Sequence, residues 1–143
     1  MEQKRIIMNY TVPPSISDFE EMAGELVRDL PDELSDYTGD LVVQVEDFPD
    51  DATQSDHELD DAYELLGLYR GGNEVAPGVE KKISKDEDVL TLYRRPILDV
   101  WCENGEDLSA ILREVMIEEI AKAHDFSGDE IDEMSARHYQ GML

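Results

Sequence analysis

Residues 114–128 read EVMIEEIAKAHDFSG, and their apolar side chains recur at the spacing of an amphipathic helix. When residues are projected at about 100° each, Val115 and Met116 lie on one apolar stripe and Glu119 falls in its middle. A carboxylate in that position loses its hydration unless it pairs with a cation or lines a cavity. The helix that carries it is predicted to span about 106–124, with acidic side chains at its N-terminus.

The rest of the chain predicts a small α+β domain, with helices and strands largely segregated along the sequence. Helices are predicted at 16–29, from Pro96 to Trp101 and after a capping box at Ser127, and strands within 40–48, 63–72 and 88–98. The second and third strands both end in Leu-Tyr-Arg, which indicates antiparallel neighbours. We therefore expect a short mixed or antiparallel sheet packed against helices that include the one at 106–124.

The chain has 143 residues, the size of one domain, and residues 1–143 are expected to form it. Residues 1–14 are predicted to be an N-terminal extension or a strand that Pro13-Pro14 ends. Residues 46–64 hold nine acidic side chains and neither Lys nor Arg. They lack the residue spacing of a calcium-binding EF-hand loop, so a solvated acidic loop is predicted there.

The composition is strongly acidic, because 36 Asp and Glu against 12 Lys and Arg give a formal net charge of -24. A nucleic acid and an anionic membrane would both be repelled, so neither is expected as a partner. Such acidity suits a solvated surface, a saline medium or a basic partner. No apolar run reaches the length of a membrane span or a signal sequence, and a cytoplasmic protein is expected.

Few other side chains have reactive chemistry. Cys102 is the single cysteine, so it permits no disulfide within the chain, and it is expected to pack beside Trp101. His57 and His138 stand in polar sequence and are expected at the surface.

Geometry alone leaves two interpretations of Glu119 open. In the first, the side chain reaches solvent at the helix end or pairs with Arg94 or Arg95, since a predicted strand ends there. In the second, it is a general base whose pKa is tuned by a partly buried cleft.

Four segments carry a resemblance to a known family: VVQVEDFPDD (42–51), ELLGLYRG (64–71), LTLYRRPIL (90–98) and LREVMIEEIAKAHDFSGDEIDEM (112–134). Together with the amphipathic first helix, and in this order, they make the chain from about Phe19 to Met134 resemble the short bacterial zincin-like metallopeptidases, or minimal zincins. The resemblance implies a small zincin-like domain in which the helix at 106–124 is the former active-site helix.

The active helix of that family carries His-Glu-x-x-His followed by x-x-Gly-x-x-Asp. Two histidines at i and i+4 share one helical face and bind zinc, the glutamate is the general base, and a later residue completes three ligands. The resemblance places Glu119 at the glutamate, and it places Glu118, Lys122 and Gly128 at the three ligand positions. Asp125 stands at the glycine, which calls the geometry of a third ligand into question.

Lys122 is the most damaging of these replacements, because an ammonium group has no lone pair near neutral pH and repels a metal ion. A rebuilt metal set of Glu118, His124 and Asp125 is a weaker alternative. It is disfavoured because His124 lies about 200° round the helix from Lys122.

The resulting hypothesis is a zincin-like domain that has lost zinc binding and peptidase activity and serves as a binding or structural module. A Glu118–Lys122 charge pair would replace the metal, no cofactor is expected, and a peptide is the expected kind of ligand. One alternative is an active metal-dependent peptidase with an altered ligand set, in which zinc is bound and Glu119 is the base. Another is an acidic docking protein for a basic partner.

Overall fold

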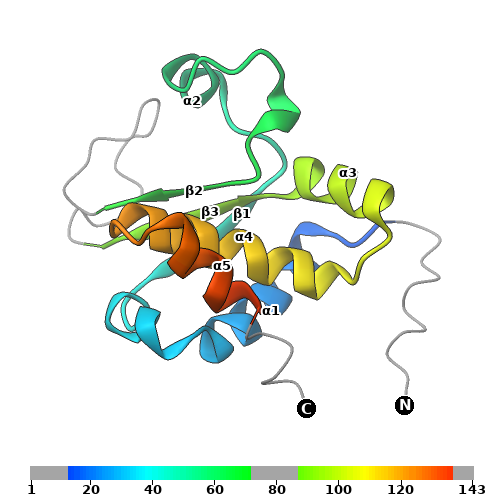
Figure 1. Cartoon of the computed structure of the whole chain (residues 1–143). Coiled ribbons are helices and arrows are strands. Elements are labelled where there is room, and N and C mark those ends of the chain that lie inside the picture. The colour runs from blue at the N-terminus through cyan, green and yellow to red at the C-terminus, as the bar shows by residue number, and fades with distance from the viewer. Residues whose placement is uncertain (1–12, 72–86, 137–143) are drawn as a thin grey trace, which may run out of the picture.

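The computed structural model describes residues 13–71 and 87–136. In Figure 1 a small sheet lies behind the long helix α4, with α1 and α5 below it and α2 at the top of the view. The strands are β1 (Val42–Glu46), β2 (Gly67–Arg70) and β3 (Val89–Tyr93). The α-helices are α1 (Ile16–Leu26), α2 (Asp51–Asp56), α3 (Arg94–Asn104), α4 (Leu108–Ala123) and α5 (Gly128–Ala136). Short 3-10 helices are η2 (Val27–Asp29), η3 (Asp32–Tyr37) and η4 (Ala62–Glu64).

The sheet is mixed and has the strand order β1-β3-β2. β2 and β3 are antiparallel, with Leu68 opposite Thr91, so the pairing predicted from their shared Leu-Tyr-Arg endings is confirmed. β1 runs parallel to β3, with Val43 opposite Leu90. The predicted α+β class, a short mixed sheet packed against helices, is therefore confirmed.

α4 is the central helix of the domain, and it packs against β2, β3, α1, α3 and α5. The sequence projection placed a single apolar stripe on this helix, which is incomplete. Ile111, Ile117 and Ala121 are buried as well as Val115 and Met116, because α4 is covered on more than one side. Its apolar surface therefore extends around most of the helix, as expected for an element in the core.

Side-chain caps define the helix ends close to the predicted boundaries. The Ser15 hydroxyl accepts from the Asp18 amide and the Asp18 carboxylate accepts from the Ser15 amide, which forms a capping box at α1. Ser127 and Glu130 form the predicted capping box at α5. α3 begins at Arg94 rather than Pro96, and Gly105 in the left-handed conformation ends it.

The acidic segment 46–64 is not only a loop, so this prediction is partly wrong. It contains α2 and η4, and acidic side chains cap both, since the Asp50 and Asp61 carboxylates accept from the Thr53 and Tyr63 amides. Carboxylates that bond the free amides at a helix N-terminus favour helix over disordered chain. The predicted extension or strand at 1–14 lies almost entirely outside the described residues.

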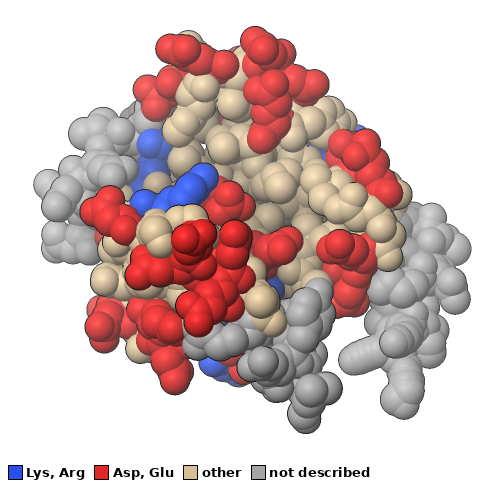
Figure 2. Space-filling view, viewed as in Figure 1, with Lys and Arg blue, Asp and Glu red and all other residues tan. Residues whose placement is uncertain are grey.

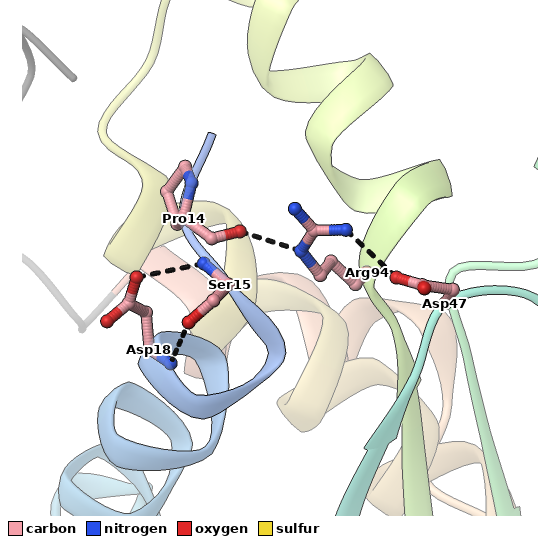
Figure 3. A network of polar contacts seen from close by, with 5 residues as sticks. All are labelled: Pro14, Ser15, Asp18, Asp47 and Arg94. Carbon is pink, nitrogen blue, oxygen red and sulfur yellow. Dashed lines mark hydrogen bonds and ion pairs between the residues drawn. The ribbon is translucent and has the colours of Figure 1, made fainter. Parts of the chain in front are cut away.

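Arg94 joins three parts of the chain that are distant in sequence (Figure 3). Its Nε–H donates to the Pro14 carbonyl at 2.6 Å, and its Nη1–H donates to Asp47 Oδ1 at 2.9 Å. Pro14 precedes Ser15, the N-cap of α1, and Asp47 directly follows β1. The guanidinium therefore fixes the entry to α1 against the ends of β1 and β3. Within the described ranges, no helix is long and apolar enough to cross a bilayer.

Candidate functional site

Glu119 lies near the C-terminal end of α4, where this helix passes β2 at Gly67. A Cβ atom at Gly67 would lie 2.9 Å from Val115 Cγ1 and 3.4 Å from Glu119 Cγ. Because such contacts are at or below van der Waals distance, only glycine lets the strand and the helix approach this closely. The Glu119 side chain is consequently 15% exposed and lies against the sheet.

The carboxylate of Glu119 pairs with Lys122, whose Nζ lies 3.4 Å from Oε2. The predicted Glu118–Lys122 pair is wrong, and Glu118 is exposed. An exposed pair at i and i+4 contributes only about 0.2–0.5 kcal/mol, whereas a charge removed from water interacts more strongly with a nearby cation. Lys122 therefore turns to the more buried carboxylate.

Neither Arg94 nor Arg95 pairs with Glu119, so the predicted arginine pair is also wrong. Arg94 bonds Pro14 and Asp47, and the Arg95 guanidinium lies 5.4 Å from the centre of the Phe48 ring. β3 ends at Tyr93 and packs against α4, but Arg94 and Arg95 begin α3 and face the segment that follows β1.

Burial raises the pKa of Glu119 above its ordinary value, because water no longer stabilises the charged form. The Lys122 ammonium opposes this shift by its charge and its hydrogen bond, and the Glu118 carboxylate adds to it. Burial prevails, so the carboxyl holds its proton more tightly than an exposed glutamate does. A raised pKa is a property of many general bases and also of structural ion pairs.

Tyr93 was not singled out in the sequence, yet it shares the polar surroundings of Glu119. Burial raises the pKa of Tyr93 well above its ordinary value, and the charges of Glu46, Asp50 and Glu119 add to the rise. The nearby Arg70 charge lowers it. Tyr93 therefore keeps its proton and remains a hydrogen-bond donor. The only feature of the sequence that drew attention to Tyr93 was the Leu-Tyr-Arg ending of the predicted strand. That ending does not indicate where α4 lies relative to Tyr93.

The model of the family described as zincin-like metallopeptidase matches residues 38–138, more than two-thirds of the chain. The chain belongs to the zincin-like metallopeptidase family. The resemblance from about Phe19 to Met134 is thus confirmed as to family, and the matched region begins between α1 and β1. No curated protein matches the chain.

The turn that follows α4 in this zincin-like protein keeps a conformation that usually requires glycine. Asp125 has a φ of 66°, and aspartate is one of the few other residues that adopts this region readily. The Asp125 amide donates to the Lys122 carbonyl, and the Phe126 amide donates to the Ala121 carbonyl. These two bonds are those of a Schellman motif. The backbone at Asp125 therefore takes the left-handed conformation that a glycine takes readily.

His124 is held in an aromatic cluster. Its ring stacks on Tyr37 with centroids 3.8 Å apart and meets Tyr69 edge-on at 5.2 Å. Its Nδ1 lies 2.9 Å from the Ile120 carbonyl oxygen, which can only accept, so Nδ1 carries a proton.

The remaining candidate residues are scattered. In the part of the chain that the structure describes, no three His, Cys, Asp or Glu residues are grouped to hold a metal ion. The alternative set of Glu118, His124 and Asp125 is therefore not brought together. His57 lies beside Asp56 with its side chain 33% exposed, Cys102 is exposed rather than packed as predicted, and His138 lies outside the described residues.

The three residues that the resemblance places at the ligand positions do not supply the donors of a zinc centre. Glu118 offers one exposed carboxylate and Lys122 an ammonium group that repels cations. Gly128 is the first residue of α5 and has no side-chain donor. Zinc in proteins takes at least three donors from Cys, His, Asp or Glu, and this set supplies one.

Proposed function

We propose that this zincin-like protein is a peptide-binding module that no longer hydrolyses peptides with zinc. The observation that carries the proposal is the Lys122 ammonium, 3.4 Å from the Glu119 carboxylate, at the position where the family motif has a histidine. A fixed cation supplies positive charge but neither a lone pair for a metal nor a coordinated water. In this proposal the Lys122 ammonium supplies the positive charge that a zinc ion would place beside Glu119. It does not supply the activated water that peptide hydrolysis needs.

Glu119 has little to act on without such a water. A catalytic zinc ion lowers the pKa of bound water from about 15.7 to about 7, which is what makes a carboxylate an adequate base. The residues at the ligand positions give no comparable means of activation. We therefore assign Glu119 the role of a charged residue that lines the site rather than that of a working base.

The edge of β2 supports a peptide as ligand. In the described sheet β2 pairs with β3 alone, so its other side is an edge. The Tyr93 amide donates to the Leu66 carbonyl, so the backbone of the next residue, Gly67, points away from β3 by the alternation of an antiparallel pair. An extended peptide binds such an edge by adding a strand. At Gly67 this strand would run past Glu119 on α4.

Charge favours a basic peptide. Figure 2 shows acidic side chains over the α2 segment at the top and over α5 at the lower centre. The surface between them is largely uncharged, with Lys and Arg side chains at its left. The net charge of -24 attracts lysine and arginine side chains at long range.

The competing candidate is a metal-dependent peptidase with an altered ligand set. The raised pKa of Glu119 favours it, since general bases are commonly tuned upward. It requires metal-dependent cleavage of an unfolded protein that Glu119→Gln abolishes and Cys102→Ser, away from the site, leaves unchanged.

A docking surface on the acidic segment 46–64 is a further candidate. Tyr63 is 40% exposed and packs edge-on against Phe48 at 5.2 Å, so an aromatic ring is presented among carboxylates. A basic partner held there would bind more weakly as salt is added and would lose affinity on Tyr63→Ser.

One set of measurements separates these candidates. Zinc content is determined for protein purified with added zinc, and backbone amide shifts are followed as a lysine-rich or a glutamate-rich peptide is added. The proposal expects no stoichiometric zinc, no cleavage, and shifts at residues 67–70 and 119–122 with the basic peptide only. One tightly held zinc per chain, or shifts confined to 50–64, would overturn it.

A further inference from the structure

We infer that a lysine of the bound peptide replaces Lys122 as the partner of Glu119, so that Lys122 competes with the ligand for its site. This inference rests on the proposed function, in which an extended basic peptide adds to the edge of β2. It requires one particular side chain of the peptide, a lysine opposite Gly67. It also gives Lys122 an autoinhibitory role, since this residue occupies Glu119 while the site is empty.

The register of β2 decides which backbone groups a peptide can reach. The Tyr93 amide donates to the Leu66 carbonyl, so these two residues form a hydrogen-bonded pair. Such pairs alternate along an antiparallel ladder, which turns the backbone of Leu68 towards β3 and the backbones of Gly67 and Tyr69 away from it. Gly67 and Tyr69 therefore face the edge that no described strand covers. An added strand would bond there and place one of its residues opposite Gly67.

The side chain of that peptide residue would lie on the same face of the sheet as α4. The Cβ direction of Gly67 points at α4, because a Cβ atom there would lie 2.9 Å from Val115 Cγ1 and 3.4 Å from Glu119 Cγ. Residues directly opposite each other on neighbouring strands share one face, with Cβ atoms about 4.5–5.5 Å apart. A lysine opposite Gly67 can therefore reach the Glu119 carboxylate with its flexible four-carbon stem.

The two members of the ion pair differ in exposure, which makes Lys122 the replaceable one. The Glu119 side chain is 15% exposed, whereas that of Lys122 is 55% exposed. A carboxylate that has lost most of its water is stabilised by a cation, but an exposed lysine gives up rotamer freedom for a small gain. A ligand lysine whose backbone is already held by β2 loses less freedom at Glu119. Lys122 can then return to water at little cost.

The test compares two blocked peptides of five residues. The probe is threonine-valine-lysine-valine-threonine, which favours an extended strand, and its control has norleucine in place of lysine. Affinities are measured by calorimetry for the wild-type chain and for Lys122→Met. Titrations at pH 8 favour the ionised carboxyl, since burial raises the pKa of Glu119.

Lys122→Met should bind the lysine peptide about threefold to fivefold more tightly than the wild type, because the competing ammonium is gone. It should bind the norleucine peptide no better. Arg28→Met is the matched control, since Arg28 is exposed in η2 and its replacement removes the same charge. Its effect should stay below about 1.5-fold, as expected for a distant, screened charge. Glu119→Gln should bind the two peptides equally.

Amide shifts separate failure of this inference from failure of the proposed function. Suppose the lysine peptide shifts residues 67–70 but binds Lys122→Met no more tightly than the wild type. That result would overturn the inference and leave the proposed function standing. An equal gain with the norleucine peptide or in Arg28→Met, or a preference for lysine that survives Glu119→Gln, would have the same meaning. A lysine peptide that shifts residues 67–70 in none of the variants would instead overturn the proposed function.

Discussion

The Lys122 ammonium lies 3.4 Å from the carboxylate of Glu119, one helical turn earlier on α4. This pair, rather than the more exposed Glu118, determines the charge at the end of the helix that borders β2. Burial raises the pKa of Glu119 while Lys122 lowers it, so two opposed effects meet in one side chain. The balance between them can be measured.

The stability of the protein should depend on pH through Glu119. Its folded-state pKa is raised by burial above its unfolded value, so the folded state binds the proton more tightly. The contribution of this residue is therefore most favourable below the unfolded pKa and falls as pH rises through the folded value. Glu119→Gln removes this loss, so the variant should exceed the wild type in stability at pH 7 and lose that advantage near pH 4. Urea unfolding at both pH values measures the difference.

Lys122→Met serves as the reciprocal variant. It removes both interactions that lower the pKa of Glu119, so stability should fall more steeply with rising pH than in the wild type. Identical pH profiles for the wild type and both variants would contradict a buried Glu119 whose pKa is raised.

Gly67→Ala should destabilise the fold by roughly 1–3 kcal/mol, because the added methyl group would lie 2.9 Å from Val115 Cγ1 and force α4 away from β2. Gly24→Ala in α1 is the matched control, since its Cβ meets nothing within 4 Å. The control should gain about 0.5–1 kcal/mol from better helix propensity. Chemical unfolding measures both, and Val115→Ala should offset part of the loss at Gly67. Equal effects at the two glycines would show that the close approach is not needed.

Arg94→Met should cost about 2–3 kcal/mol, because it leaves the Pro14 carbonyl without its charged donor and breaks the contact with Asp47. Asp47→Asn isolates the second part of this network. The Asp47 side chain is half-exposed, so its ion pair should contribute less than about 1 kcal/mol. If the two variants lost the same stability in urea, the bond to Pro14 would not be the stronger one.

Asp125→Ala should destabilise the protein by about 1 kcal/mol, since alanine adopts a φ of 66° less readily than aspartate. Asp125→Gly, the control, should be close to neutral because glycine takes this conformation without strain. Thermal unfolding of both variants measures the contrast. A tolerated alanine would mean that the turn is not held in the left-handed region.

Added salt should stabilise the folded protein. At a net charge of -24 the folded chain repels itself, and potassium chloride raised from about 0.1 to 1 M shortens the screening length from about 10 to 3 Å. The melting temperature should rise over this range by calorimetry. A decrease would mean that attractive ion pairs, such as Arg94–Asp47, outweigh the overall repulsion.

The sequence was sufficient for features that depend on neighbouring residues. The capping box at Ser127 and Glu130 and the strand at Val42–Glu46 both follow from local chemistry and periodicity. The family was also accessible, because its segments occur in order along the chain. The short helix α2 was missed, since the many carboxylates of 46–64 indicated exposure, while two of them act as caps in α2 and η4.

Only the tertiary structure decided the partners of the charged side chains. The sequence placed Glu118 and Glu119 at equally short distances from Lys122, and the packing of α4 against β2 made one carboxylate buried and left the other in water. Likewise, Arg94 bonds residues that are 80 and 47 positions away. Periodicity fixes the face on which a side chain lies. The strength of its interactions depends on how much water the surrounding fold removes, and that is set by distant segments.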